Sequence, residues 1–242
     1  MSSFARDSRL IFDLGMNNGD DTDFYLRRGF DVVAVEANPA LCDKAAQRFR
    51  EAIAAGRLTI LNAAISDKPG EATFFVNLDN DHWSSLDIGW AGRDASRCRE
   101  IKVRCVTLGK LFAEFGVPHY LKIDVEGVDQ AVLEQLQDAR ELPLYVSVED
   151  CRFGPRYMEI LASCGYDGFK LLDQSTVPHM KGGFPPGSSG PFGDEVPGVW
   201  LSHAQMMAEY SATVRDAQGN RLAPRTHWWD IHCTNIGHAR AA

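Results

Sequence analysis

The chain has 242 residues, of which 45% are hydrophobic and 24% charged, and a formal net charge of −8. A chain of this size can bury the core of a large α/β domain without disulfide bonds, so we expect a single domain over residues 1–242. The acidic balance argues against DNA, RNA or an anionic membrane as a general partner.

The sequence contains no pattern typical of a membrane segment or of cysteine-bound metal. The first ten residues, "MSSFARDSRL", include no apolar run, and no later apolar run approaches the ~20 residues that span a bilayer. The six cysteines are scattered, with no C-x-x-C pair or Cys/His ligand spacing, and we interpret them as reduced. We therefore expect a cytoplasmic protein.

Strand and helix patterns alternate along the first 150 residues. Helical patterns begin at Asp20 and Pro39, and two more lie near "GKLFAEFG" and "QAVLEQLQ". This alternation predicts βαβ units and a mostly parallel sheet with helices on both faces, whose ligands bind outside the carboxyl ends of the strands. The strand patterns are "RLIFDLG", "DVVAVE", "RLTILNAAIS", "ATFFVN", "EIKVRCVTL", "YLKIDVEG" and "LYVSVED".

The C-terminal third contains a segment of unusual composition. Residues 181–198, "KGGFPPGSSGPFGDEVPG", are too rich in glycine and proline for an interior element and predict a long surface loop. This loop is either a lid over a substrate or a connection without a role. After a helical stretch near "HAQMMAEYSATVRD", the segment "HWWDIHCTN" predicts a last, aromatic-rich strand.

A glycine turn follows the first strand pattern, in "IFDLGMNNGDD". Asp13 lies near the end of the strand, and Gly15 to Gly19 form the turn. The dinucleotide fingerprint G-x-G-x-x-G would require a second glycine where Asn17 stands, and Asp20 follows where the pyrophosphate would lie. S-Adenosylmethionine has no phosphate, and its ammonium and sulfonium attract carboxylates. The turn therefore favours this ligand over NAD, although acids in a first helical turn also stabilise the helix dipole.

Glu36 ends the second strand pattern, at roughly the distance from the turn at which dinucleotide sites place an acid on the ribose. That contact is shared by NAD and S-adenosylmethionine, so it predicts an adenosine-bearing ligand without choosing between them. The alternative is a solvated acid at a strand end.

Six segments, in this order, resemble the FkbM family of S-adenosylmethionine-dependent methyltransferases: "IFDLGMNNGD", "VVAVEANP", "NAAISDKPG", "SSL" at 84–86, "VTLGKLF" and "LKIDVEGVD". The resemblance covers roughly residues 10–150. It implies the class I methyltransferase (Rossmann-like) fold, an α/β fold with a mostly parallel seven-stranded sheet and an antiparallel last strand. It also implies O-methylation of a small-molecule or sugar hydroxyl, with S-adenosylmethionine as the cofactor.

The same resemblance assigns roles to individual residues. It implies that Glu36 holds the ribose and that Ala64 and Ile65 lie beside the adenine. The residues that it places around the methionine part of the cofactor are Asp13, Gly15, Asn17 and Gly19.

Two acids in "LKIDVEGVD" are candidates for the reactive end of the cofactor. Strand alternation places Asp124 and Glu126 on the same side, if the strand extends that far. Asp124 would orient the methionine part or the substrate, and Glu126 would accept a proton from an attacking hydroxyl. The alternative is a helix-capping turn, with Asp129 in the first turn of the helix.

A metal site is a second possibility at the same sheet edge. Glu149 and Asp150 end the next strand pattern, and together with Asp124 they resemble the acids that bind Mg²⁺ in catechol-type O-methyltransferases. Strand-end acids are common, and three carboxylates also suit a substrate amine, so we predict a methyltransferase that needs no metal.

Two histidines are further candidates for a general base. His82 lies in the irregular stretch 78–99, and His232 alternates with Asp230 in the last strand pattern. Histidine often serves as a base near neutral pH, but an isolated histidine is more often a packed or surface residue. Two alternatives to a methyltransferase remain, an NAD-dependent oxidoreductase and a non-catalytic cofactor-binding module.

Overall fold

The computed structural model describes residues 7–150, 153–180, 184 and 188–237. The chain divides into two compact units, residues 1–143 and 144–242. No helix of the described residues has the length and apolar character needed to cross a membrane.

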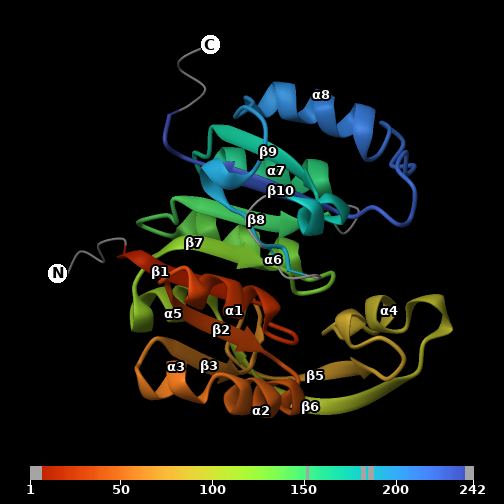
Figure 1. The fold of residues 1–242 in the computed structure, drawn as a ribbon. Helices are drawn as coiled ribbons and strands as arrows, with labels where there is room; N and C mark the ends of the chain where they lie inside the picture. Colours follow the sequence, from red (N-terminus) through yellow and green to blue (C-terminus); the bar gives the residue numbers. More distant parts are fainter. Residues whose placement is uncertain (1–6, 151–152, 181–183, 185–187, 238–242) are drawn as a thin grey trace. The chain divides into compact units, whose positions relative to one another are not determined.

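Four parallel strands form the main sheet of the first unit, in the order β3-β2-β1-β7 (Figure 1). The central residues of β1, β2 and β7 are mostly apolar and almost fully buried, as expected of parallel strands covered on both faces, whereas β3 at the edge of the sheet is only partly buried. These strands are β1 (Asp7–Leu14), β2 (Asp31–Glu36), β3 (Leu58–Asn62) and β7 (Pro118–Ile123).

Helices connect these strands, and local sequence signals mark where they begin. Asn38 caps α2 by accepting a hydrogen bond from the Ala40 amide, and proline occupies the first helical position. Thr107 caps α5 by accepting from the Lys110 amide. The helices are α1 (Asp20–Arg27), α2 (Pro39–Arg48), α3 (Arg50–Ala54), α5 (Leu108–Phe115) and α6 (Asp129–Glu134), which continues into the 3₁₀ turn η3 (Gln135–Asp138).

A separate three-stranded sheet, in the order β4-β6-β5, also belongs to the first unit. β5 and β6 pair antiparallel, and the segment that connects them, which contains α4, lies at one end of the pair (Figure 1). The irregular stretch 78–99 forms short helical turns within this connection. The elements are β4 (Ala64–Ile65), β5 (Gly70–Asn77), η1 (Asp81–Trp83), α4 (Ile88–Ala91), η2 (Arg93–Ala95) and β6 (Cys98–Val106).

In the second unit the last strand, β10, runs antiparallel to both of its neighbours, in the order β8-β10-β9. The strand β9 and the helix α7 were not evident from the sequence. The elements are β8 (Tyr145–Glu149), α7 (Gly154–Ser163), β9 (Gly168–Asp173), η4 (Gln174–His179), η5 (Gly193–Glu195), α8 (His203–Thr213) and β10 (Trp229–Thr234).

The main sheet has seven strands in the order β3-β2-β1-β7-β8-β10-β9. It is mostly parallel with an antiparallel last strand, so the predicted Rossmann-like α/β fold is confirmed.

Part of the glycine- and proline-rich loop packs within the second unit. Phe192 and Val196 are buried, and the Val196 carbonyl accepts a hydrogen bond from the buried Lys170 ammonium at 2.6 Å. Residues 181–183 and 185–187 of the predicted loop lie outside the described residues. The lid function stays a prediction.

Candidate functional site

A pocket of about 600 Å³, part of it open solvent, lies in the first unit. Its walls come from the turn after β1, the end of β2, residues 63–65, the segment after β5, and residues 124–128 after β7. The pocket therefore lies at the carboxyl ends of the parallel strands, where the sequence predicts a ligand.

The glycine turn requires its glycines. Gly15 has a φ of 86°, and a Cβ there would lie 1.8 Å from the Asp124 carbonyl oxygen. Gly19 has a φ of 81°, and a Cβ there would lie 2.7 Å from the Phe49 ring. Only glycine allows so close an approach of the turn to the segment after β7. Gly15 and Asn17 line the pocket, whereas Gly19 precedes α1.

Glu36 fixes the turn and also lines the pocket. Its two carboxylate oxygens accept hydrogen bonds from the backbone amides of Asn17 at 2.9 Å and Asn38 at 2.7 Å. Burial raises the pKa of Glu36, and the amides of Asn38 and Asn17 oppose that rise. Each oxygen keeps a second lone pair for a ligand hydroxyl.

The remaining pocket walls also fit S-adenosylmethionine. The Asn17 side-chain oxygen is buried without a hydrogen-bond partner among the described residues, and it suits a ligand ammonium or hydroxyl. Ala64 and Ile65 are buried in β4 and line the pocket together with Phe74, giving an apolar wall suited to an adenine ring. The glycine cradle, the unpaired acceptor and the apolar wall together match the predicted cofactor.

Asp13 lies behind this pocket, outside its lining residues. Its fully buried carboxylate accepts from the Thr22 hydroxyl at 2.7 Å and lies 3.4 Å from the Lys122 ammonium. The same ammonium lies 3.2 Å from Asp21 and 3.4 Å from Asp124, which does line the pocket. Asp13 therefore does not contact the pocket directly; Lys122 lies between it and Asp124, a pocket residue. The sequence analysis did not single out Lys122.

Lys122 carries its charge in the core. Burial lowers the pKa of its ammonium, but Asp124, Asp21 and Asp13 outweigh burial and raise that pKa well above its usual value. Burial raises the pKa of Asp13, and Lys122 opposes that rise. One buried cation is therefore shared by three acids, from β1, α1 and the segment after β7.

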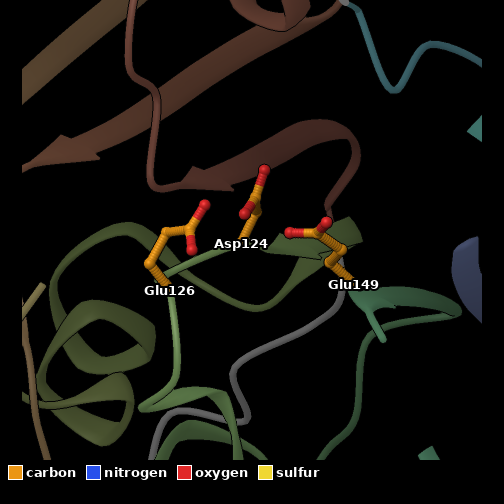
Figure 2. Close-up of side chains that lie close together, drawn as sticks. All are labelled: Asp124, Glu126 and Glu149. Carbon is orange, nitrogen blue, oxygen red and sulfur yellow. The ribbon is translucent and has the colours of Figure 1, made fainter. Parts of the chain in front are cut away.

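Asp124 and Glu126 both line the pocket, and Figure 2 shows their side chains extending from the segment after β7. Strand alternation does not place them, because β7 ends at Ile123. Instead, the buried Asp129 carboxylate accepts from the amides of Val125 and Gly127, both at 2.9 Å, and holds a tight turn. Burial raises the pKa of Asp129 to about 6. Asp129 thus serves the turn, as the capping alternative suggests.

The Glu126 carboxylate has two donors on one oxygen. Its Oε2 accepts from the Trp90 indole at 2.6 Å and from the Arg93 guanidinium at 3.0 Å. Burial and then the nearby Asp124 charge raise the pKa of Glu126 to about 7, against the opposing effects of Trp90 and Arg93. Trp90 and Arg93 lie in the irregular stretch, and only their types, not their spacing, could have drawn attention to them.

The two candidate histidines differ in their surroundings. His82 is an exposed residue of η1 that lines the pocket. His232 is buried in β10, and burial followed by the Lys170 charge lowers its pKa to about 3. An imidazole with so low a pKa is a weak proton acceptor at neutral pH. The surroundings therefore favour His82 over His232 as a base.

The acids at the end of β8 have separate environments in the second unit. Asp150 accepts from the Tyr210 hydroxyl at 2.8 Å and from the Arg215 guanidinium at 3.3 Å. Asp150 therefore connects the end of β8 to α8 and to the residues that follow it. Glu149, the third side chain drawn in Figure 2, ends β8. The metal alternative that includes Glu149 and Asp150 stays a prediction.

The fold and pocket are those expected of a Rossmann-like methyltransferase, because the glycine turn, the buried Glu36 and the apolar wall of Ala64 and Ile65 lie together at the carboxyl ends of the parallel strands. Residues 13–167 match the family model described as the methyltransferase FkbM domain. That match covers more than half of the chain, which therefore belongs to the FkbM methyltransferase family. The predicted family and its cofactor, S-adenosylmethionine, are confirmed.

Several solved methyltransferases are similar to this chain. A crystal structure of methyltransferase FkbM from Methylobacillus flagellatus KT has a TM-score of 0.42 and 14% identity, over 70% of this chain and 40% of that chain. Geranyl diphosphate C-methyltransferase from Streptomyces coelicolor A3(2), solved with Mg²⁺, geranyl diphosphate and S-adenosylhomocysteine, has a TM-score of 0.42 and 14% identity, over 95% of this chain and 74% of that chain.

A third such structure is 1,6-didemethyltoxoflavin-N1-methyltransferase from Burkholderia thailandensis, with bound 1,6-didemethyltoxoflavin and S-adenosylhomocysteine. It has a TM-score of 0.39 and 11% identity, over 94% of this chain and 71% of that chain. No curated protein matches the chain significantly.

Proposed function

We propose that this protein transfers a methyl group from S-adenosylmethionine to a hydroxyl oxygen of a small molecule or sugar. The observation that carries the proposal is the Glu126 carboxylate, which lines the pocket and whose pKa is raised to about 7. An alcohol is a weak nucleophile until its proton leaves, and a base with a pKa near the working pH is well matched to accept that proton.

The pocket residues divide among the parts of the cofactor. Glu36 would accept the ribose hydroxyls, and Ala64 and Ile65 would contact the adenine. The methionine part would lie against the backbone of Gly15 and near the side chains of Asn17 and Asp124. When bound, S-adenosylmethionine supplies an electrophilic methyl group.

The residues of the chain then have to orient the acceptor and remove its proton. Glu126 would accept the hydroxyl proton, and Asp124, held by Lys122 at 3.4 Å, would fix the charged end of the cofactor. His82, an exposed residue that also lines the pocket, would be a second candidate for the proton acceptor. Holding the acceptor in line with the methyl group supplies much of the rate enhancement.

The Glu36→Gln variant is expected to bind S-adenosylhomocysteine more weakly, by about 1.5–3 kcal/mol, because charge-assisted hydrogen bonds to the ribose are lost. Isothermal titration calorimetry measures this affinity. Glu51→Gln, an exposed acid on α3, is the matched control and should bind as the wild type does. NAD should not bind either protein. Equal affinity in the two variants would remove Glu36 from the site.

Methyl transfer to a hydroxyl-rich metabolite pool, followed with isotope-labelled S-adenosylmethionine and mass spectrometry, tests the reaction. We expect O-methylated products, and turnover that survives EDTA, because the base is a side chain. Turnover abolished by EDTA and restored by Mg²⁺ would instead establish the metal-dependent alternative. Binding of the cofactor with no labelled product from any pool would favour a non-catalytic module.

A further inference from the structure

We propose that Trp90 and Arg93, supported by Trp83, are positioning residues that hold Oε2 of Glu126 and leave its Oε1 to receive the proton of the acceptor. This inference rests on the proposed role of Glu126 as the base. Both donors, at 2.6 and 3.0 Å, bind the same oxygen. Among the described residues, none donates a hydrogen bond to Oε1.

Arg93 is itself held in place. Its guanidinium lies 4.5 Å from the centre of the Trp83 ring and 4.8 Å from that of the Trp90 ring. A second nitrogen donates to the Trp90 carbonyl at 3.2 Å. Contacts of a guanidinium with two ring faces restrict its rotation and reduce the entropy lost in binding the carboxylate. The Arg93 guanidinium is therefore already oriented to donate to Glu126.

The backbone at Glu126 and Gly127 also packs against the segment between β5 and β6. The Ser85 hydroxyl donates to the Glu126 carbonyl at 2.7 Å. A Cβ on Gly127 would lie 2.8 Å from the Trp90 ring, so only glycine lets the indole approach this closely. Glu126 has a φ of 54°, a conformation unusual for a residue with a side chain. Such a conformation persists where the surroundings hold it in place.

These contacts give the segment between β5 and β6 a role at the site. It lies outside the parallel sheet, yet it lines part of the pocket and supplies both donors to the proposed base. A carboxylate held at one oxygen has its other oxygen fixed in direction, which is what proton transfer to a positioned group requires.

The charged groups around Glu126 determine whether its pKa rises or falls when Arg93 is replaced. Asp124 lies on the same segment and disfavours the carboxylate form, whereas Arg93 favours it. Asp81 and His82 belong to the wall of the same pocket, and Asp129 holds the turn. Removing the guanidinium therefore leaves burial and Asp124 unopposed by a cation, so Glu126 should bind its proton more tightly.

The test is a pH titration of the Glu126 carboxyl by ¹³C NMR in the full chain, with the signal assigned by its loss in Glu126→Gln. In Arg93→Gln and in Trp90→Phe, the midpoint should move to higher pH by about one unit. Trp90→Phe keeps a ring beside Gly127 but removes the N–H donor. Arg97→Gln, whose guanidinium pairs with the exposed Asp79, is the matched control and should titrate as the wild type does.

Activity gives the second readout. The acid limb of the pH profile should move in the same direction in both variants, with S-adenosylhomocysteine affinity retained. An unmoved midpoint in folded Trp90→Phe and Arg93→Gln would overturn the proposal. If Arg93→Gln does not fold, Arg93→Lys retains a cation without the fork and should move the midpoint less. Full activity in Glu126→Gln with a moved midpoint in Arg93→Gln would overturn the base assignment but leave the contact between these residues intact.

Discussion

Replacing Glu126 by glutamine is expected to lower kcat by about 10²–10⁴-fold, the usual contribution of general-base assistance. The amide keeps the shape of the side chain and an oxygen that can accept from Trp90, but it cannot take a proton at neutral pH. Affinity for S-adenosylhomocysteine should change little, because the lost interaction belongs to proton transfer rather than to cofactor binding. Initial rates and calorimetry on the same preparations measure the two effects.

The pH dependence of the wild type gives a second view of the same group. The base must be a carboxylate, so with the pKa of Glu126 at about 7, kcat/KM should fall as pH drops below about 7. Glu126→Gln should lack this acid limb. A glutamine variant with the wild-type rate and profile would transfer the role of base to His82 or remove the need for one.

The contribution of Glu126 to the free energy of unfolding should fall as pH rises, whereas kcat/KM should increase. The pKa of Glu126 is raised from 4.5 in the unfolded chain to about 7 in the folded one, so the folded state binds the proton more tightly. Its contribution to the free energy of unfolding is therefore fully present below about pH 4.5 and is lost as pH rises through about 7. Subtracting the unfolding curves of Glu126→Gln from those of the wild type isolates this contribution.

The parts of the site that the sequence predicts are those set by the sheet edge. Glu36 and the turn at Gly15 each follow a recognisable strand, and parallel strands bring their carboxyl ends together. Ala64 and Ile65 follow from the family resemblance, and the pocket lies against them. The prediction that Asp124 and Glu126 lie together at the pocket is correct. A turn held by Asp129 brings them together, rather than strand alternation.

The remaining residues depend on contacts that no local pattern encodes. Arg93 and Trp90 lie in a stretch without periodicity, and they meet Glu126 only because the β5–β6 hairpin brings them to it across more than thirty positions. Lys122 stands within a strand pattern, where a lysine ordinarily indicates a solvent-facing position. Its burial depends on acids from two other elements, and this is a property of the packed sheet.

Replacing Lys122 by methionine is expected to lower the free energy of unfolding by about 3–5 kcal/mol, since it leaves buried carboxylates without their cation. The Lys122 side chain is 3% exposed, and those of Asp13 and Asp21 are 0% and 9% exposed. Urea denaturation measures the change. Lys102→Met, which removes an exposed ammonium bound to the Thr73 hydroxyl, is the matched control and should cost less than about 0.5 kcal/mol.

Two further measurements separate electrostatics from packing in that variant. Adding Asp21→Asn to Lys122→Met should restore part of the lost stability, because one unpaired charge disappears, and the two substitutions should be strongly non-additive. Without the ammonium the pKa of Asp13 should rise further, so the gap between variant and wild type should narrow as pH falls and the buried carboxylates protonate. A gap that stays constant with pH, and no restoration in the double variant, would mean that Lys122 stabilises the core through its methylene groups rather than its charge.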